Sequence, residues 1–191
     1  MCNKDNLLIE IYDFECISDV VNNCTIDRLC SHITEAQDIH LSNKVGWSLL
    51  QKVIDNPTSD DYKDLMNGST FEYCGQTQKN FGLKRVLVHY SYGIYKYLNN
   101  YVDTSYGTVY KNVADSVPVD SKILKTIRDE HFNLANEYWK GVEMYLCANK
   151  EIFKEFNCKN ECEGCKDGND RSVSVGSRIR KARTFKKYGN K

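Results

Sequence analysis

Apolar residues recur at intervals of three and four along much of the chain, which is the spacing of an amphipathic helix. The longest such patterns cover Asn80–Tyr101 and residues 120–148, where charged side chains lie off the apolar stripe. Three shorter stripes predict further helices over residues 25–39, 41–56 and 58–67. The pattern therefore predicts an all-α fold, a bundle of about four to five helices.

Two segments between these helices lack the helical spacing. Residues 69–79 are predicted as a small hairpin or loop inserted around Cys74–Gly75. Residues 99–118 are predicted as a long ordered loop, which is uncommon enough in a compact domain to suggest a functional surface. Tyrosine is enriched both at protein interfaces and in half-buried cores, and both interpretations remain open. On the first, three residues of this loop are candidate partner-binding residues: Tyr101, Tyr106 and Tyr110.

Composition and charge change near Asn157, and we predict a domain boundary there. The predicted parts are an N-terminal arm (1–24), a helical domain (25–157) and a cysteine-containing, basic C-terminal extension (158–191). The chain has a formal net charge of zero, yet Lys166–Lys191 alone carries a net charge of +7. The rest of the protein is therefore acidic, and the extension forms a basic tail.

The basic tail is the most distinctive candidate for binding a partner. Its candidate contact residues are Arg178, Arg180, Lys181, Arg183, Phe185, Lys186 and Lys187. The cations could neutralise nucleic-acid phosphates, dock on an acidic protein surface, or only keep the tail solvated. Alternating residues from Ser172 onward would also allow the tail to add as a strand to the sheet edge of a neighbour.

The cysteines allow a metal site but do not complete one. The chain has nine cysteines and begins without the pattern of a secretory signal, so we expect reduced thiols. The spacing of Cys158, Cys162 and Cys165 suits zinc, although a structural zinc site needs four ligands. Cys74, Cys147 or a histidine could supply the fourth ligand; otherwise the three residues form a surface cluster of thiols.

Signatures of catalysis and of membrane insertion are missing from the sequence. It contains no phosphate-binding glycine loop, no GxSxG and no HExxH, and its four histidines form no cluster in sequence. We therefore expect no enzyme activity, and no cofactor apart from the candidate zinc. Since no run approaches the roughly 20 apolar residues of a membrane span, we also expect no membrane association.

Several helical segments resemble a family of virion proteins. The run Ile33–Leu41 is followed by Gly46-Trp47-Ser48-Leu49-Leu50, and Gly82-Leu83-Lys84 opens a tyrosine-rich helix. The last long helix carries Glu137-Tyr138-Trp139 and Tyr145–Asn149. Together, over about residues 25–157, these segments resemble the head-to-tail adaptors of tailed bacteriophages, most closely the neck or ring proteins of crAss-like phages that infect gut Bacteroidales.

The resemblance implies a structural protein made in the host cytoplasm and incorporated into the virion neck. It implies a dodecameric ring that connects the portal to the tail and lines the DNA passage. The implied partners are further copies of the chain, the portal protein, adjacent neck or tail proteins and, without sequence specificity, genomic DNA. The cysteine cluster and basic tail allow an alternative, a small zinc-containing regulatory protein that binds nucleic acid.

Overall fold

The computed structural model describes residues 6–15, 17, 26–110 and 119–158. Its helices are η2 (Ile11–Phe14), α2 (Ile26–Glu35), the π-helix η3 (Ala36–Leu41), α3 (Ser42–Val45), α4 (Trp47–Asp55), α5 (Asp60–Asn67), α6 (Leu83–Leu98) and α7 (Ser121–Ala148). Strands within these residues form two antiparallel hairpins: β1 (Ser69–Tyr73) with β2 (Gln76–Asn80), and β3 (Tyr101–Thr104) with β4 (Gly107–Tyr110).

The fold is mixed α and β, so the prediction of an all-α bundle is wrong. The insertion around Cys74–Gly75 is the β1–β2 hairpin, in which Ser69 pairs with Asn80. Part of the predicted 99–118 loop is a second hairpin, whose turn uses the positive φ of Gly107. The hairpin alternative for residues 69–79 is therefore confirmed. Residues 101–110 were predicted only as loop, because strands of four residues give too short a pattern to separate a strand from a loop.

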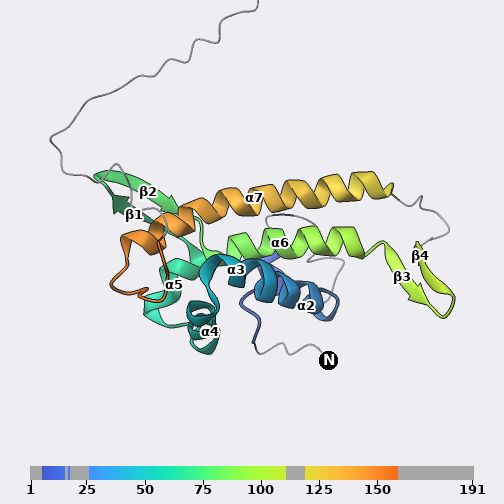
Figure 1. The fold of residues 1–191 in the computed structure, drawn as a ribbon, viewed down its shortest axis with the longest axis horizontal. Helices are drawn as coiled ribbons and strands as arrows, with labels where there is room; N and C mark the ends of the chain where they lie inside the picture. Colours follow the sequence, from blue (N-terminus) through green and yellow to red (C-terminus); the bar gives the residue numbers. More distant parts are fainter. Residues whose placement is uncertain (1–5, 16, 18–25, 111–118, 159–191) are drawn as a thin grey trace, which may run out of the picture. The chain divides into compact units, whose positions relative to one another are not determined.

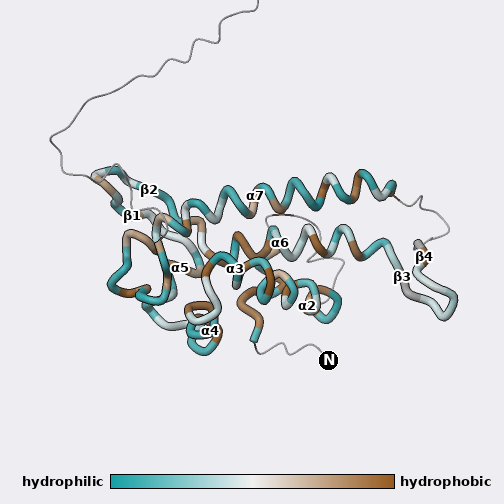
Figure 2. The backbone as a smooth tube through the Cα atoms, in the orientation of Figure 1, coloured by the Kyte–Doolittle hydropathy of each residue, from teal (hydrophilic) through white to brown (hydrophobic). Residues whose placement is uncertain are grey.

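Helix α6 is the central element of the described fold. It lies between α7 on one side and α2, η3 and α5 on the other (Figure 1). Every residue from Val86 to Tyr95 is buried, and apolar positions recur along both α6 and α7 (Figure 2). Ser91, a buried polar residue of this helix, is satisfied locally, because its hydroxyl donates to the Leu87 carbonyl at 2.8 Å. Burying each large apolar side chain contributes roughly 1.5–3 kcal/mol, so α6 holds the surrounding elements in place.

The N-terminal residues join this core. The described residues belong to the first compact unit of the chain, residues 1–159. Within the first unit, Leu8, Ile9 and Phe14 are buried among the apolar residues of the helices. Residues 6–15, which the sequence placed in an N-terminal arm, therefore contribute to the core of the described fold.

Candidate functional site

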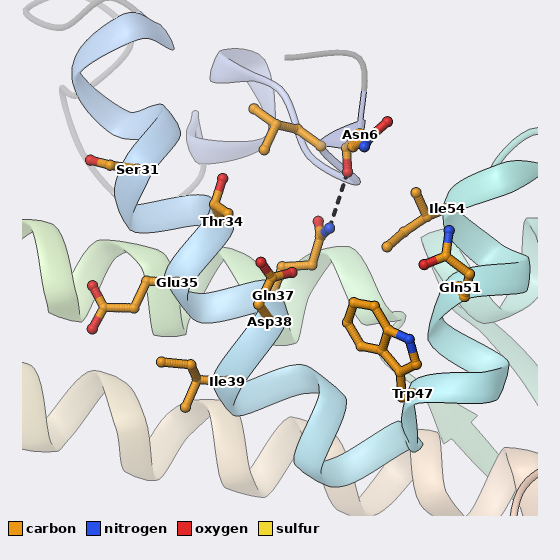
Figure 3. Close-up of a pocket in the computed structure, with 11 residues that line it drawn as sticks. Asn6, Ser31, Thr34, Glu35, Gln37, Asp38, Ile39, Trp47, Gln51 and Ile54 are labelled. Atoms are coloured by element: carbon orange, nitrogen blue, oxygen red, sulfur yellow. Dashed lines mark hydrogen bonds between the residues drawn. The ribbon is translucent and has the colours of Figure 1, made fainter. Parts of the chain in front are cut away.

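A surface groove of about 770 Å³ lies where the π-helix η3 meets α4 and the N-terminal segment. Figure 3 shows the Trp47 ring pointing from α4 toward η3, with Ile54 above it on the same helix. The groove is lined by Asn6, Leu7, Ser31, Thr34, Glu35, Gln37, Asp38, Ile39, Trp47, Gln51 and Ile54. Trp47 and Ile39 remain 57% and 50% exposed, so large apolar side chains face solvent here.

Local backbone geometry creates the groove. The six residues Ala36–Leu41 form a π-helix, a wider turn that shifts Asp38 and Ile39 relative to the face of α2. Five residues later, Gly46 adopts a φ of 86° and separates α3 from α4. A residue with a Cβ adopts this conformation only with strain, so Gly46 lets the chain turn and start α4 at Trp47. The sequence pattern predicted continuous helices here and gave no signal of the π-helix.

Gln37 fixes the N-terminal wall of the groove. It is 3% exposed, and its side-chain oxygen accepts a hydrogen bond from the Leu8 amide at 3.2 Å. Its side-chain nitrogen donates to the Asn6 carbonyl at 3.0 Å (Figure 3). A buried side-chain amide whose oxygen and nitrogen both form hydrogen bonds fixes the position of one chain segment relative to the other. The groove therefore has a fixed wall rather than a free terminal segment.

The groove combines an apolar surface with negative charge. Glu35 and Asp38 are exposed carboxylates at its edge, and no lysine or arginine is among its lining residues in the described part of the chain. An apolar surface rimmed by polar groups is typical of a site that binds another protein. The charge favours a partner segment that is itself cationic.

The structure places the three candidate tyrosines on the β3–β4 hairpin. Tyr101 pairs with Tyr110 across the two strands, and the ring of Tyr101 lies 6.3 Å from that of Tyr97 at the end of α6. Tyr106 lies in the turn and is fully exposed, with Val109 exposed nearby. The hairpin extends beyond the end of α6 (Figure 1) and presents an aromatic tip.

The candidate residues of the C-terminal tail, Arg178, Arg180, Lys181, Arg183, Phe185, Lys186 and Lys187, lie outside the described residues. Cys162 and Cys165 do as well, so zinc binding by the cysteine cluster stays a prediction. Cys158 is described and forms a disulfide with Cys147, their Cα atoms 5.7 Å apart. Cys30 and Cys74 are also disulfide-bonded, contrary to the expectation of reduced thiols.

Neither a cluster of metal-ligand side chains nor a membrane-spanning helix occurs among the described residues. No three histidine, cysteine, aspartate or glutamate side chains among them gather closely enough to hold a metal ion. Within the same residues, no helix has both the length and the apolar character that crossing a bilayer requires.

Two histidines that are distant in sequence, the buried His89 and the partly buried His131, meet between α6 and α7. The Nδ1 atoms of His89 and His131 lie 3.0 Å apart, so in the neutral pair one donates and the other accepts. Burial lowers the pKa of His89 to about 4, with repulsion from His131 and Arg85 adding to the effect. Burial also lowers the pKa of His131. The pair is therefore neutral at pH 7 and joins the two helices.

The other two histidines contact aromatic rings. The His40 ring stacks on Tyr90 with centroids 5.0 Å apart, and His32 lies 5.9 Å from the ring of Tyr95. Burial lowers the pKa of both histidines, although Glu35 acts in the opposite direction. All four histidines thus pack against ring systems, a role that their positions in the sequence could not indicate.

One family model matches the chain, over residues 41–166, and it is described as a family of unknown function, DUF6712. This match covers well over half of the sequence. The chain belongs to the DUF6712 family. No curated protein and no solved structure matches the chain. The DUF6712 match begins at the last residue of η3, so it includes Trp47, both hairpins and α6 and α7, but not the N-terminal wall of the groove.

Proposed function

We propose that this DUF6712 protein is a structural subunit of the neck of a tailed bacteriophage, where copies assemble into a ring between portal and tail. The observation that carries the proposal is the groove at η3, in which Trp47 and Ile39 are each at least half exposed. Apolar surface of this kind contributes to association when a partner covers it. The resemblance of residues 25–157 to phage neck adaptors indicates that this assembly is a ring in the neck.

In this assembly, the groove receives the basic C-terminal tail of a neighbouring copy. The groove offers the carboxylates of Glu35 and Asp38 beside apolar side chains. The tail segment 178–187 combines cations with the apolar residues Ile179 and Phe185, so it complements both properties. Charge complementarity selects the partner segment, and burial of the apolar groups supplies affinity.

The β3–β4 hairpin provides a second contact, to the portal or an adjacent neck protein. Tyr106 at its tip is fully exposed, and aromatic residues of this kind often contribute much of the binding energy of an interface. A Tyr106→Ser variant should therefore co-sediment less with the portal. Its thermal stability should be unchanged, because Tyr106 makes no contribution to the core.

Sedimentation of the full chain mixed with the portal protein of the same phage tests the assembly. The wild type should co-migrate with the portal and give ring particles in electron micrographs. A Trp47→Ser/Ile39→Asn variant should lose both properties because the groove no longer offers an apolar surface. An Ile123→Asn variant is the matched control, since Ile123 is 53% exposed on α7 and does not line the groove.

Charge reversal tests the proposed occupant of the groove. Replacing Arg178, Arg180, Lys181 and Arg183 by glutamate should prevent ring formation, and Glu35→Lys/Asp38→Lys in the same chain should restore it. Assembly that is unaffected by either set of changes would exclude the tail as the occupant. If the wild type forms no rings and does not migrate with the portal, the proposed function as a neck subunit is wrong.

A further inference from the structure

A second cavity, of about 480 Å³, lies beside the β1–β2 hairpin and the first turns of α6. Three cationic residues line it, Lys79, Lys84 and Arg85, against one carboxylate, that of Asp13. This surplus of positive charge occurs in a part of the chain, residues 1–165, whose net charge is −7. The cavity is therefore a positive site within the acidic part of the chain, and its sign indicates an anionic ligand.

The cations are held in place but keep hydrogen-bond donors available. The Lys79 ammonium lies 5.2 Å from the centre of the Phe81 ring, and the Arg85 guanidinium lies 5.2 Å from that of Tyr138. Neither forms an ion pair with a described carboxylate. These ring contacts orient each cation without using the N–H groups that would bind an anion.

A neutral donor also lacks a partner at this cavity. Ser69 lines it, and the Ser69 hydroxyl oxygen is buried with no hydrogen-bond partner among the described residues. Buried hydroxyls are normally hydrogen-bonded, and a buried hydroxyl without a partner lowers the stability of the folded protein. Because less than 1 Å² of this oxygen is accessible to solvent, a ligand oxygen in the cavity reaches it only when the Ser69 side chain rotates toward the cavity. Thr70, next in the strand, adds another hydroxyl-bearing side chain to the lining.

Close backbone contacts make the frame of the cavity rigid. Gly82, just before α6, approaches Met66 so closely that an added Cβ would lie 2.5 Å from the Met66 carbonyl oxygen. A Cβ added at Gly141 on α7 would likewise lie 2.5 Å from the carbonyl oxygen of Lys79. Asn80 connects both sides, because its amide donates to the Asp64 carbonyl and accepts from the Gly82 amide. The cationic side chains thus extend from a fixed backbone.

We propose that this cavity binds a phosphate group, with Lys79, Arg85 and Ser69 as its donors. Phosphate presents several acceptor oxygens and negative charge, which suits two cations and a hydroxyl. Arg85 can contact two oxygens at once, whereas Lys79 acts as a point charge. Lys84 adds charge while remaining paired with Asp13, at 3.5 Å. The phosphate belongs either to the backbone of a nucleic acid or to a small phosphorylated ligand. Its binding does not depend on ring assembly.

Titration of the full chain with pyrophosphate in a phosphate-free buffer, followed by ³¹P NMR, tests the site. The wild type should bind pyrophosphate with an affinity that falls as salt is added. A Lys79→Gln/Arg85→Gln variant should bind it at least about tenfold more weakly, because two charge-assisted contacts are lost. Ser69→Ala should also weaken binding, by a smaller factor. Circular dichroism melting of each variant establishes that it is folded.

A Lys125→Gln/Lys150→Gln variant is the control, since it loses the same charge from exposed residues outside the cavity. It should bind pyrophosphate like the wild type. If the wild type does not bind pyrophosphate, or if the control loses as much affinity as the cavity variant, the site does not exist.

Duplex DNA distinguishes the two sources of the phosphate. Any DNA binding by the tail cations is the same in the wild type and the cavity variant, so only the difference between the two proteins reports on the cavity. If the cavity variant shows weaker DNA binding with a smaller salt dependence, the ligand is a nucleic-acid backbone. If DNA binding is equal while pyrophosphate binding is lost, the ligand is a small phosphorylated molecule.

Discussion

Acid should destabilise the protein through His89, whose ring is 4% exposed at the contact of α6 and α7. Burial is the main reason why the pKa of His89 falls from 6.5 to about 4. Between these pH values the unfolded chain binds a proton at His89 that the folded protein does not bind. The contribution of His89 to the free energy of unfolding is therefore complete above pH 6.5 and is lost as the pH falls toward 4.

The size of this effect follows from the lowered pKa. Each unit by which a pKa is lowered corresponds to about 1.4 kcal/mol, so the change from 6.5 to about 4 removes ~3 kcal/mol by pH 4. A domain of ordinary stability unfolds with a free energy of roughly 5–15 kcal/mol, so the loss is a large fraction of the total. Burial lowers the pKa of His131 too, and this acts in the same direction.

Urea unfolding at pH 7 and pH 4, followed by circular dichroism, measures the loss. A His89→Phe variant keeps an aromatic ring beside Tyr138 but has no group that titrates. Its loss of unfolding free energy between the two pH values should be smaller than that of the wild type by ~3 kcal/mol. Carboxylates that titrate in this range affect both proteins alike, so the difference between the two proteins reports on the His89–His131 contact.

His32→Phe is the matched control. Burial also lowers the pKa of His32, but Glu35 opposes the effect, so this variant should change the pH dependence less than His89→Phe does. The reasoning would be refuted by parallel pH profiles for the wild type and His89→Phe, or by an equal change in the two variants.

Three further perturbations test the packing. Gly141→Ala places a methyl group 2.5 Å from the Lys79 carbonyl oxygen, so urea unfolding should show a loss of about 1–3 kcal/mol. Gln37→Leu leaves two backbone groups of residues 6–8 unpaired, which should lower stability by about 1–3 kcal/mol and speed hydrogen exchange in residues 6–15 but not in α6. Replacing both Cys147 and Cys158 by serine removes a cross-link between residues 11 apart, so thermal and urea unfolding should show a loss of roughly 2–3 kcal/mol relative to the oxidised wild type.

The sequence alone determined the position of the long helices. The stripe of Leu83, Val86, Leu87 and Ile94 predicted a helix within residues 80–101, and α6 occupies Leu83–Leu98. The last helix was predicted over residues 120–148, and the Asp120 carboxylate caps α7 by accepting a hydrogen bond from the Lys122 amide. These features depend on interactions within a few residues, which is why a local pattern is enough to reveal them.

Only the tertiary structure decided which side chains meet. His89 and His131 are 42 residues apart, and their contact depends on how α6 packs against α7. The groove at η3 forms where the π-helix, the turn at Gly46 and the N-terminal segment held by Gln37 come together. The positive cavity forms where the β1–β2 hairpin packs beside α6. The spacing of apolar residues reports which face of each helix is buried. The distance between two faces depends on packing between elements, which no local pattern contains.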